Sequence, residues 1–217
     1  YAPSDHTVIA GNWIGTNSDG DAALANDGAG IYVQSASETL IGGPDAASQN
    51  VISGNSFAGI YVVGSYAPGF GVSIAGNYIG TDWTGTAAVP NAGAAGVLLD
   101  APNVTVGGAS ASQRNLISGN LAASGIRIDS GDNNLIQNNW VGVDATGTVA
   151  LPNDWGIAQY GPSVGTTIGG VADPTLDASH AGPRNVVAGN TRLGIRVYGG
   201  TLVEGNYVGL GADGATA

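Results

Sequence analysis

The sequence predicts an all-β fold, because a short pattern, Asn followed by any residue and then Ile or Val, returns at seven nearly evenly spaced places along the chain. The copies start 38, 27, 38, 24, 46 and 21 residues apart, so long and short intervals alternate. A repeat of this length is the signature of a solenoid, in which each repeat forms one coil. We therefore predict a right-handed parallel β-helix of about six to seven coils. The repeated asparagines are Asn12, Asn50, Asn77, Asn115, Asn139, Asn185 and Asn206.

Each coil is expected to contain three short strands, because three kinds of segment alternate apolar and other residues with the two-residue rhythm of β structure. The first kind begins at Thr7, the second is the asparagine pattern itself, and the third begins at Gly30. Alternation places one apolar residue of each kind in the interior, where successive coils stack into three columns. The first column is Ile9, Ile41, Ile74, Val106, Ile136, Ile168 and Val203; the second is Ile14, Ile52, Ile79, Ile117, Val141, Val187 and Val208; the third is Ile31, Ile60, Val97, Ile126, Ile157 and Ile195.

The repeated asparagines are predicted to be structural rather than catalytic. When coils stack, the side-chain amides lie one coil apart, and each amide can donate to one neighbour and accept from the other. The result is an internal ladder of hydrogen bonds that satisfies polar groups buried at the bend between two strands.

Composition excludes several classes of partner. The net charge is −11, and a protein that binds a phosphate backbone needs clustered cations, so we expect no nucleic-acid partner. No apolar run approaches the roughly 18 residues that a membrane helix needs, so no membrane insertion is expected. The chain has no cysteine, which leaves neither a disulfide framework nor thiolate chemistry.

Residues 1–217 are predicted to form a single β-helix domain without a linker. The chain begins at Tyr1 without an initiator methionine or a signal peptide, which indicates a processed product or an excised segment. Its first and last repeats, 7–15 and 201–209, have the same phase. This match predicts a segment of a longer repeat array, or self-association end to end, since open strand edges invite pairing with another chain.

Three motifs carry a resemblance to a known group of proteins. They are Ile-Gly-Thr-Asp-x-Thr-Gly-Thr at 79–86, Thr-Ile-Gly-Gly at 167–170 and Arg-Asn-Leu-Ile-Ser-Gly-Asn at 114–120. The chain resembles right-handed parallel β-helix repeat proteins of the bacterial surface or secreted type, in the pectate-lyase-like fold group. That group implies carbohydrate-active lyases, hydrolases and epimerases, as well as adhesins and phage tailspikes. Fold alone does not choose among these activities.

The outward residues of the second strand kind form an apolar stripe, with an aromatic residue in every second coil. Successive aromatic residues are therefore about 10 Å apart, a spacing that suits stacking on alternate sugars of an extended glycan. In the alternative, the loops of about a dozen residues at 17–29, 82–95 and 144–155 fold over the rings, because an exposed apolar stripe needs a cover or a partner. The stripe is Trp13, Val51, Tyr78, Leu116, Trp140, Val186 and Tyr207.

The outward residues of the third strand kind supply the candidates for catalysis. Alternation places Asp100 and Asp129 at equivalent positions on adjacent coils, about 5 Å apart, with Arg127 beside them. Two carboxylates at that distance suit an acid and nucleophile pair for glycoside cleavage, and with a bound cation Arg127 suits the base of a lyase. The alternative is a surface ion-pair cluster without chemistry. Tyr32 and Tyr61 on the same face are candidates for glycan binding.

An acidic run in the first loop suggests a calcium site. Asp19 and Asp21 follow Asn17, and calcium prefers several oxygen ligands of this kind. The alternative is ordinary turn formation by Asp and Gly. No cofactor is otherwise required, and Ca²⁺ is the one ion the pattern suggests.

Taken together, these patterns favour an extracellular or cell-surface scaffold of a prokaryote or virus, structural or adhesin-like, which forms filaments by end-to-end stacking. Nearly every recurring residue has a structural role, so enzymatic activity is the second interpretation. A polysaccharide lyase or glycoside hydrolase, and a glycan-binding module, are the alternatives that remain open.

Overall fold

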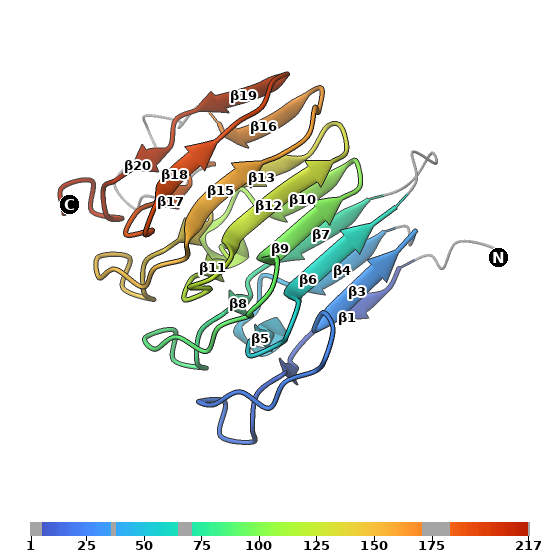
Figure 1. Ribbon diagram of the computed structural model, residues 1–217, viewed down its shortest axis with the longest axis vertical. Helices are drawn as coiled ribbons and strands as arrows, with labels where there is room; N and C mark the ends of the chain where they lie inside the picture. Colours follow the sequence, from blue (N-terminus) through green and yellow to red (C-terminus); the bar gives the residue numbers. More distant parts are fainter. Residues whose placement is uncertain (1–5, 36–37, 65–70, 171–182, 217) are drawn as a thin grey trace.

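The chain folds into a parallel β-helix of about seven coils (Figure 1). The computed structural model describes residues 6–35, 38–64, 71–170 and 183–216. The strands form three parallel sheets of seven, seven and six strands, in which each strand pairs with the equivalent strands of the coils before and after it. The predicted all-β class and the three strands per coil are confirmed.

Coil 1 runs from β1 to β3, coil 2 from β4 to β6, and the numbering continues to coil 7, which contributes β19 and β20. The first sheet contains β1 (Val8–Ile9), β4 (Thr39–Gly42), β7 (Val72–Ala75), β10 (Val104–Gly107), β13 (Leu135–Gln137), β16 (Thr166–Gly169) and β19 (Thr201–Glu204). The second contains β2 (Trp13–Ile14), β5 (Val51–Ile52), β8 (Tyr78–Ile79), β11 (Leu116–Ile117), β14 (Trp140–Val141), β17 (Val186–Val187) and β20 (Tyr207–Val208). The third contains β3 (Ile31–Gln34), β6 (Ala58–Val63), β9 (Ala95–Asp100), β12 (Ser124–Ser130), β15 (Trp155–Gln159) and β18 (Leu193–Arg196). Short 3₁₀ turns, η1 (Ala46–Ser48) and η2 (Ala111–Gln113), precede β5 and β11.

The core consists of the three predicted columns of aliphatic side chains. Strand register pairs every column residue with its counterpart in the next coil. In coil 2, Ile41, Ile52 and Ile60 are completely buried, whereas in coil 7 the column residues Val203 and Val208 are 41% and 52% exposed. Each interior coil is therefore covered by its two neighbours, and the last coil lacks that cover on one side.

The predicted asparagine ladder is confirmed at the bend between the first and second sheets. From Asn12 to Asn206, the Nδ2 of each ladder asparagine donates to the Oδ1 of the next at 2.8 to 3.0 Å. The second N–H of each interior amide binds a backbone carbonyl, as Asn115 does to Ile74 at 2.8 Å. The ladder thus satisfies side-chain and backbone groups that the turn buries.

A second asparagine ladder, which the sequence pattern did not predict, lies at the bend between the second and third sheets. Its five links measure 2.9 to 3.1 Å. These residues follow the second strand by three positions in even-numbered coils but by twelve in odd-numbered coils, because a long loop intervenes. The uneven spacing hid the pattern. The ladder is Asn26, Asn55, Asn91, Asn120, Asn153 and Asn190.

The long loops of the odd-numbered coils lie against one another, two coils apart. The backbone N–H of Trp83 donates to the carbonyl of Gly20 at 3.1 Å, and that of Ala145 donates to the carbonyl of Gly85 at 2.9 Å. Figure 1 shows these loops projecting from one edge of the solenoid. Each loop therefore fills the height of two coils, which explains why coils with long loops alternate with coils that have short connections.

Candidate functional site

The aromatic residues of the second sheet pack against the long loops, and Trp13 is 47% exposed despite this contact. Trp140 contacts its own loop so closely that a Cβ on Gly147 would lie 2.9 Å from the ring. The guanidinium of Arg114 lies 4.3 Å from the centroid of the same ring, and Arg184 lies 4.1 Å from that of Tyr207. The aliphatic residues between the rings are almost fully buried: Val51, Leu116 and Val186. Tyr78, Trp140 and Tyr207 are thus partly covered, as the alternative interpretation expected, whereas Trp13 stays exposed.

A cavity of about 210 Å³ nevertheless opens beside this stripe, between the rings of coils 3 and 5. The guanidinium of Arg114 borders this cavity. It donates from Nε and Nη2 to Oδ1 of Asn138 at 3.2 and 3.1 Å. Burial lowers the pKa of this guanidinium. Glycan binding by Trp13, Tyr78, Trp140 and Tyr207 stays a prediction. The cavity is lined by Tyr78, Ala111, Arg114, Leu116, Trp140 and Ala145.

The outer face of the third sheet carries a continuous column of residues in register from coil 1 to coil 6. Tyr32 and Tyr61 lie next to each other in this column, with ring centroids 5.3 Å apart. Burial, with a further contribution from the nearby Asp100 carboxylate, raises the pKa of Tyr61. The two tyrosines predicted as ligand-binding residues are therefore brought together, and Asp100 lies near them.

The structure separates the candidate catalytic acids in register, which corrects the expectation that they are equivalent. β9 pairs Leu99 with Ile128 and Asp100 with Ser130, so Asp129 is the extra residue of a β-bulge. Ser130 Oγ donates to Asp100, while Asp129 pairs with Arg127 through a contact of 2.6 Å between Oδ1 and Nε. Alternation alone could not show the bulge. Catalytic roles for Asp100, Asp129 and Arg127 stay a prediction, and the geometry joins only the last two directly.

The hydrogen bond from Arg127 makes Asp129 part of a fixed surface pair. It raises the pKa of the Arg127 guanidinium, against the opposing effect of burial. Arg127 therefore stays protonated at neutral pH, which is the wrong state for the base of a lyase. Both side chains are about one-third exposed. Arg127 can therefore donate hydrogen bonds to a ligand, and the Asp129 carboxylate can accept them.

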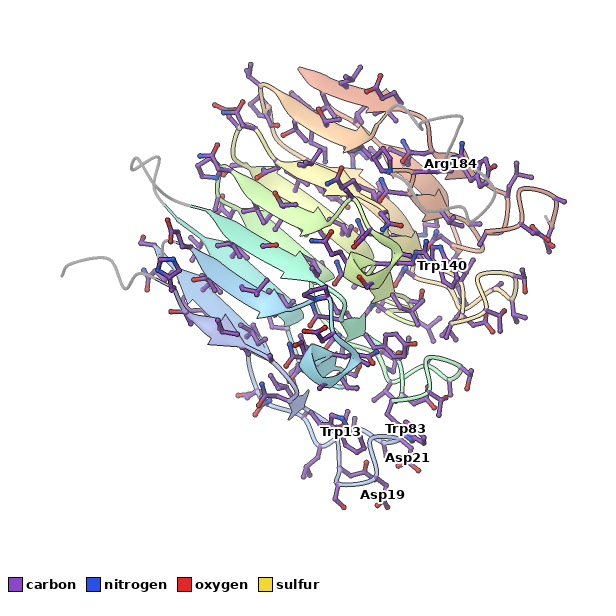
Figure 2. All side chains as sticks on the ribbon, turned by 180° about the vertical axis from the view of Figure 1, so that it is seen from behind. Trp13, Asp19, Asp21, Trp83, Trp140 and Arg184 are labelled. Carbon is purple, nitrogen blue, oxygen red and sulfur yellow. The ribbon has the colours of Figure 1, made fainter. Side chains whose placement is uncertain are left out.

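The acidic loop of coil 1 closes on itself. Asn17 Nδ2 donates to Oδ1 of Asp21 at 2.9 Å, and the backbone N–H of Asp21 donates back to Oδ1 of Asn17 at 3.2 Å. Among the residues that the structure describes, no three acidic, histidine or cysteine side chains form a group that could hold a metal ion. Figure 2 shows Asp19 and Asp21 near the tip of the loop, with Trp13 and Trp83 close by. Calcium binding by Asp19 and Asp21 stays a prediction.

In coil 3 the equivalent loop is organised by a buried aspartate. Asp82 Oδ1 accepts from the backbone N–H groups of Thr86 and Ala87 at 2.9 and 3.0 Å, and Thr84 Oγ1 donates to Oδ2 at 2.6 Å. Burial opposes ionisation, but these hydrogen bonds prevail and lower the pKa of Asp82 below its ordinary value of 3.8. Both carboxylate oxygens of Asp82 thus accept hydrogen bonds from groups of their own loop, and the side chain has a structural role.

We expect acid to remove the contribution of Asp82 to stability. Because its pKa is lowered in the folded state, the carboxylate stabilises the fold above pH 3.8, and this contribution is lost as the pH falls through the folded-state value. Thermal unfolding of the wild type and Asp82→Asn should differ clearly at pH 7 and less at pH 2.5. An equal difference at both pH values would contradict this account.

Sequence reasoning also missed part of the aromatic surface of the third sheet. Phe57 lies just before β6 and Trp155 begins β15, so neither occupies the alternating positions from which outward residues were assigned. Phe57 packs 5.8 Å from Tyr61, and Trp155 stacks 5.9 Å from Tyr160, measured between ring centroids. The signal in the sequence that could have identified them is an aromatic residue close to the start of a predicted strand.

No helix in the described ranges is long and apolar enough to cross a membrane. Comparisons with protein-family models, with curated proteins and with solved structures found no significant match for the chain.

Proposed function

We propose that the chain is a structural module, a rigid β-solenoid spacer in an extracellular or cell-surface scaffold. The supporting observation is that the recurring residues join one coil to the next, through two asparagine ladders, three aliphatic columns and a stack of loops. In a solenoid each coil contacts only its neighbours, so such residues set length and rigidity. The extracellular location rests on the resemblance to secreted and surface repeat proteins.

The height of the long loops determines which coil can follow coil 7. Coil 7 resembles coils 1, 3 and 5, and the backbone N–H of Ala212 donates to the carbonyl of Gly147 at 2.8 Å, as in the earlier loop contacts. Because each long loop fills two coil heights, a coil with a short connection fits next in register. Direct stacking of coil 7 on coil 1 of a second copy would bring two long loops into the height of one coil. We therefore propose an array of alternating coils rather than a filament of directly stacked copies.

Extending the chain by a coil of the correct kind should stabilise it. A variant that repeats residues 89–138 after Ala217 adds a third strand to coil 7 and then a coil with a short connection. This coil would cover Val203 and Val208, so we expect the thermal midpoint to rise by about 5 °C. Differential scanning calorimetry measures the change.

Two matched extensions test whether the alternation matters. In the first, residues 89–107 followed directly by residues 76–100 are added after Ala217. This extension places a long-loop coil on coil 7 and should not raise the thermal midpoint. In the second, residues 89–138 are added in scrambled order, and this extension should also leave the thermal midpoint unchanged. The spacer proposal fails if the correct extension has no effect, or if either control stabilises the chain equally.

A further inference from the structure

We propose that the open end of coil 1 is a binding site for an arginine side chain, which a coil with a short connection supplies. This inference rests on the proposed array of alternating coils and names the contact by which one coil recognises the next. Coil 1 is the first coil that the structure describes, and its open end presents Trp13, which is 47% exposed. Figure 2 shows Trp13 at one end of the solenoid and Arg184 near the other.

Where coil 4 meets coil 5, and where coil 6 meets coil 7, an arginine lies over the aromatic ring of the following coil. The guanidinium of Arg114 is 4.3 Å from the ring centroid of Trp140. That of Arg184 is 4.1 Å from the ring centroid of Tyr207. Each arginine directly precedes a ladder asparagine, and each ring directly follows the ladder asparagine of the next coil. Both junctions therefore join the same two positions of the repeat.

The same arginines also donate hydrogen bonds to the residue just before the ladder asparagine of the following coil. Arg114 donates from Nε and Nη2 to Oδ1 of Asn138 at 3.2 and 3.1 Å. Arg184 donates from Nε to the carbonyl oxygen of Gly205 at 3.0 Å. Each guanidinium is thus held by a ring and by a hydrogen-bond acceptor. A planar, delocalised cation suits this arrangement better than an ammonium group does.

Coil 1 carries a ring and an acceptor at the equivalent positions. Trp13 directly follows the ladder residue Asn12, and Gly11 directly precedes it. Gly11 has a φ of +72°, close to the +67° of Gly205, so its backbone is bent in the same way. The acidic loop of coil 1 lies close to Trp13, and its carboxylates favour a cation at this end (Figure 2).

A serine of the preceding coil makes a second recurring contact. Ser53 Oγ accepts from the backbone N–H of Gly80 at 3.0 Å and donates to the carbonyl oxygen of Thr81 at 2.7 Å. Ser118 makes the same two contacts with the following coil, at 3.0 and 2.6 Å. Coil 1 presents the equivalent backbone groups at residues 15–16. A serine four positions after the arginine would therefore reach them.

Only one of the two kinds of coil can supply the arginine. In coils with a long loop, the residue before the ladder asparagine has a positive φ, which disfavours a long side chain; these residues are Gly11, Gly76, Asn138 and Gly205. In coils with a short connection, this position holds Gln49, Arg114 or Arg184. The partner that fits the open end is therefore a coil with a short connection that contains Arg-Asn-x-Ile-Ser-Gly-Asn, as at 114–120.

The junction between coils 2 and 3 shows that a coil folds without this arginine. Gln49 takes its place, and a cavity of about 240 Å³ lies between Gln49 and Tyr78. Replacing the arginine with glutamine is therefore a change that the repeat accommodates. It removes the cation and keeps a polar side chain at the same position.

A variant in which residues 102–133 stand in place of residues 1–6 tests the proposal, because it adds a coil with a short connection before coil 1. Its thermal midpoint should exceed that of the wild type. Arg114→Gln, made in the added copy alone, should lower the midpoint by about 2–4 °C relative to the unchanged extension, as expected for the loss of one cation–π contact. Acrylamide should quench Trp13 less in the arginine extension than in the glutamine extension, with Trp13→Leu proteins giving the background fluorescence.

Trp13→Leu also completes a double-mutant cycle. Without the ring, the difference in midpoint between the arginine and glutamine extensions should fall to less than half. Ser112→Ala in the added copy is the matched control, because Ser112 is exposed and lies two residues from the arginine, and it should change neither measurement. If no extension raises the midpoint, the array of alternating coils is refuted. If the arginine and glutamine extensions raise it equally, the array stands and the arginine site is refuted.

Discussion

Replacing Asn115 with alanine will lower the free energy of unfolding by about 3–5 kcal/mol. Its amide donates to Ile74 O at 2.8 Å and to Asn139 Oδ1 at 2.9 Å, and its Oδ1 accepts from the backbone and side-chain N–H groups of Asn77 at 3.0 Å each. The alanine variant leaves these buried partners without hydrogen bonds and adds a cavity. Urea unfolding followed by circular dichroism measures the loss.

Position in the ladder provides the control for this prediction. Asn12 is exposed at the N-terminal end and links to a single ladder neighbour, Asn50, so Asn12→Ala should cost no more than about 1 kcal/mol. Asn120 holds the equivalent interior place in the second ladder, and Asn120→Ala should cost as much as Asn115→Ala. Equal small losses at all three positions would show that the ladders contribute little.

Replacing Gly107 with alanine will prevent stable stacking of coils 4 and 5. Gly107 has a φ of +93°, and a Cβ there would lie 1.8 Å from the carbonyl oxygen of Gln137 in the next coil. The obstacle is a backbone atom in the hydrogen-bonded register, which cannot rotate away as a side chain can. We expect a loss of at least about 4 kcal/mol, or failure to fold.

Gly28→Ala is the matched control for this substitution. Gly28 is exposed and does not adopt a positive φ, and a Cβ at this position would meet no heavy atom within 4 Å. Its thermal midpoint should stay within about 2 °C of the wild type, or rise slightly through the lower entropy of the unfolded chain. Soluble yield and thermal midpoint should be compared for both variants, and a stable, soluble Gly107→Ala protein would refute the steric argument.

The fold could be predicted from the sequence because its repeat is both regular and physically specific. Ile52 and Ile79 recur at the same phase, two positions after a ladder asparagine, and the structure pairs them in register. Parallel stacking of identical coils requires such matched positions, since a shift by one residue would move an inward side chain to the surface. The columns and the first ladder therefore follow directly from periodicity.

The candidate site was only partly predictable. Tyr32 and Tyr61 follow the alternation and are neighbours, as expected. Asp100 and Asp129 also follow it, but one extra residue in β12 places Ser130 opposite Asp100. A bulge leaves the local alternation of a single strand almost unchanged, so only pairing with the adjacent strand reveals it.

The sequence by itself determined the solenoid, its coil number, its interior columns and one asparagine ladder, because each depends on residues that recur at nearly constant intervals. Tertiary structure decided which aromatic residues are covered, where the second ladder runs and how the surface acids pair. These features depend on contacts between residues that lie tens of positions apart in the sequence, on different coils. They also depend on loops that pack against the loops of coils two positions away. The loop over Trp140 and the open face around Tyr32 show the difference, since both are aromatic residues at outward strand positions. Only the surrounding coils make the first a support for a loop and leave the second exposed.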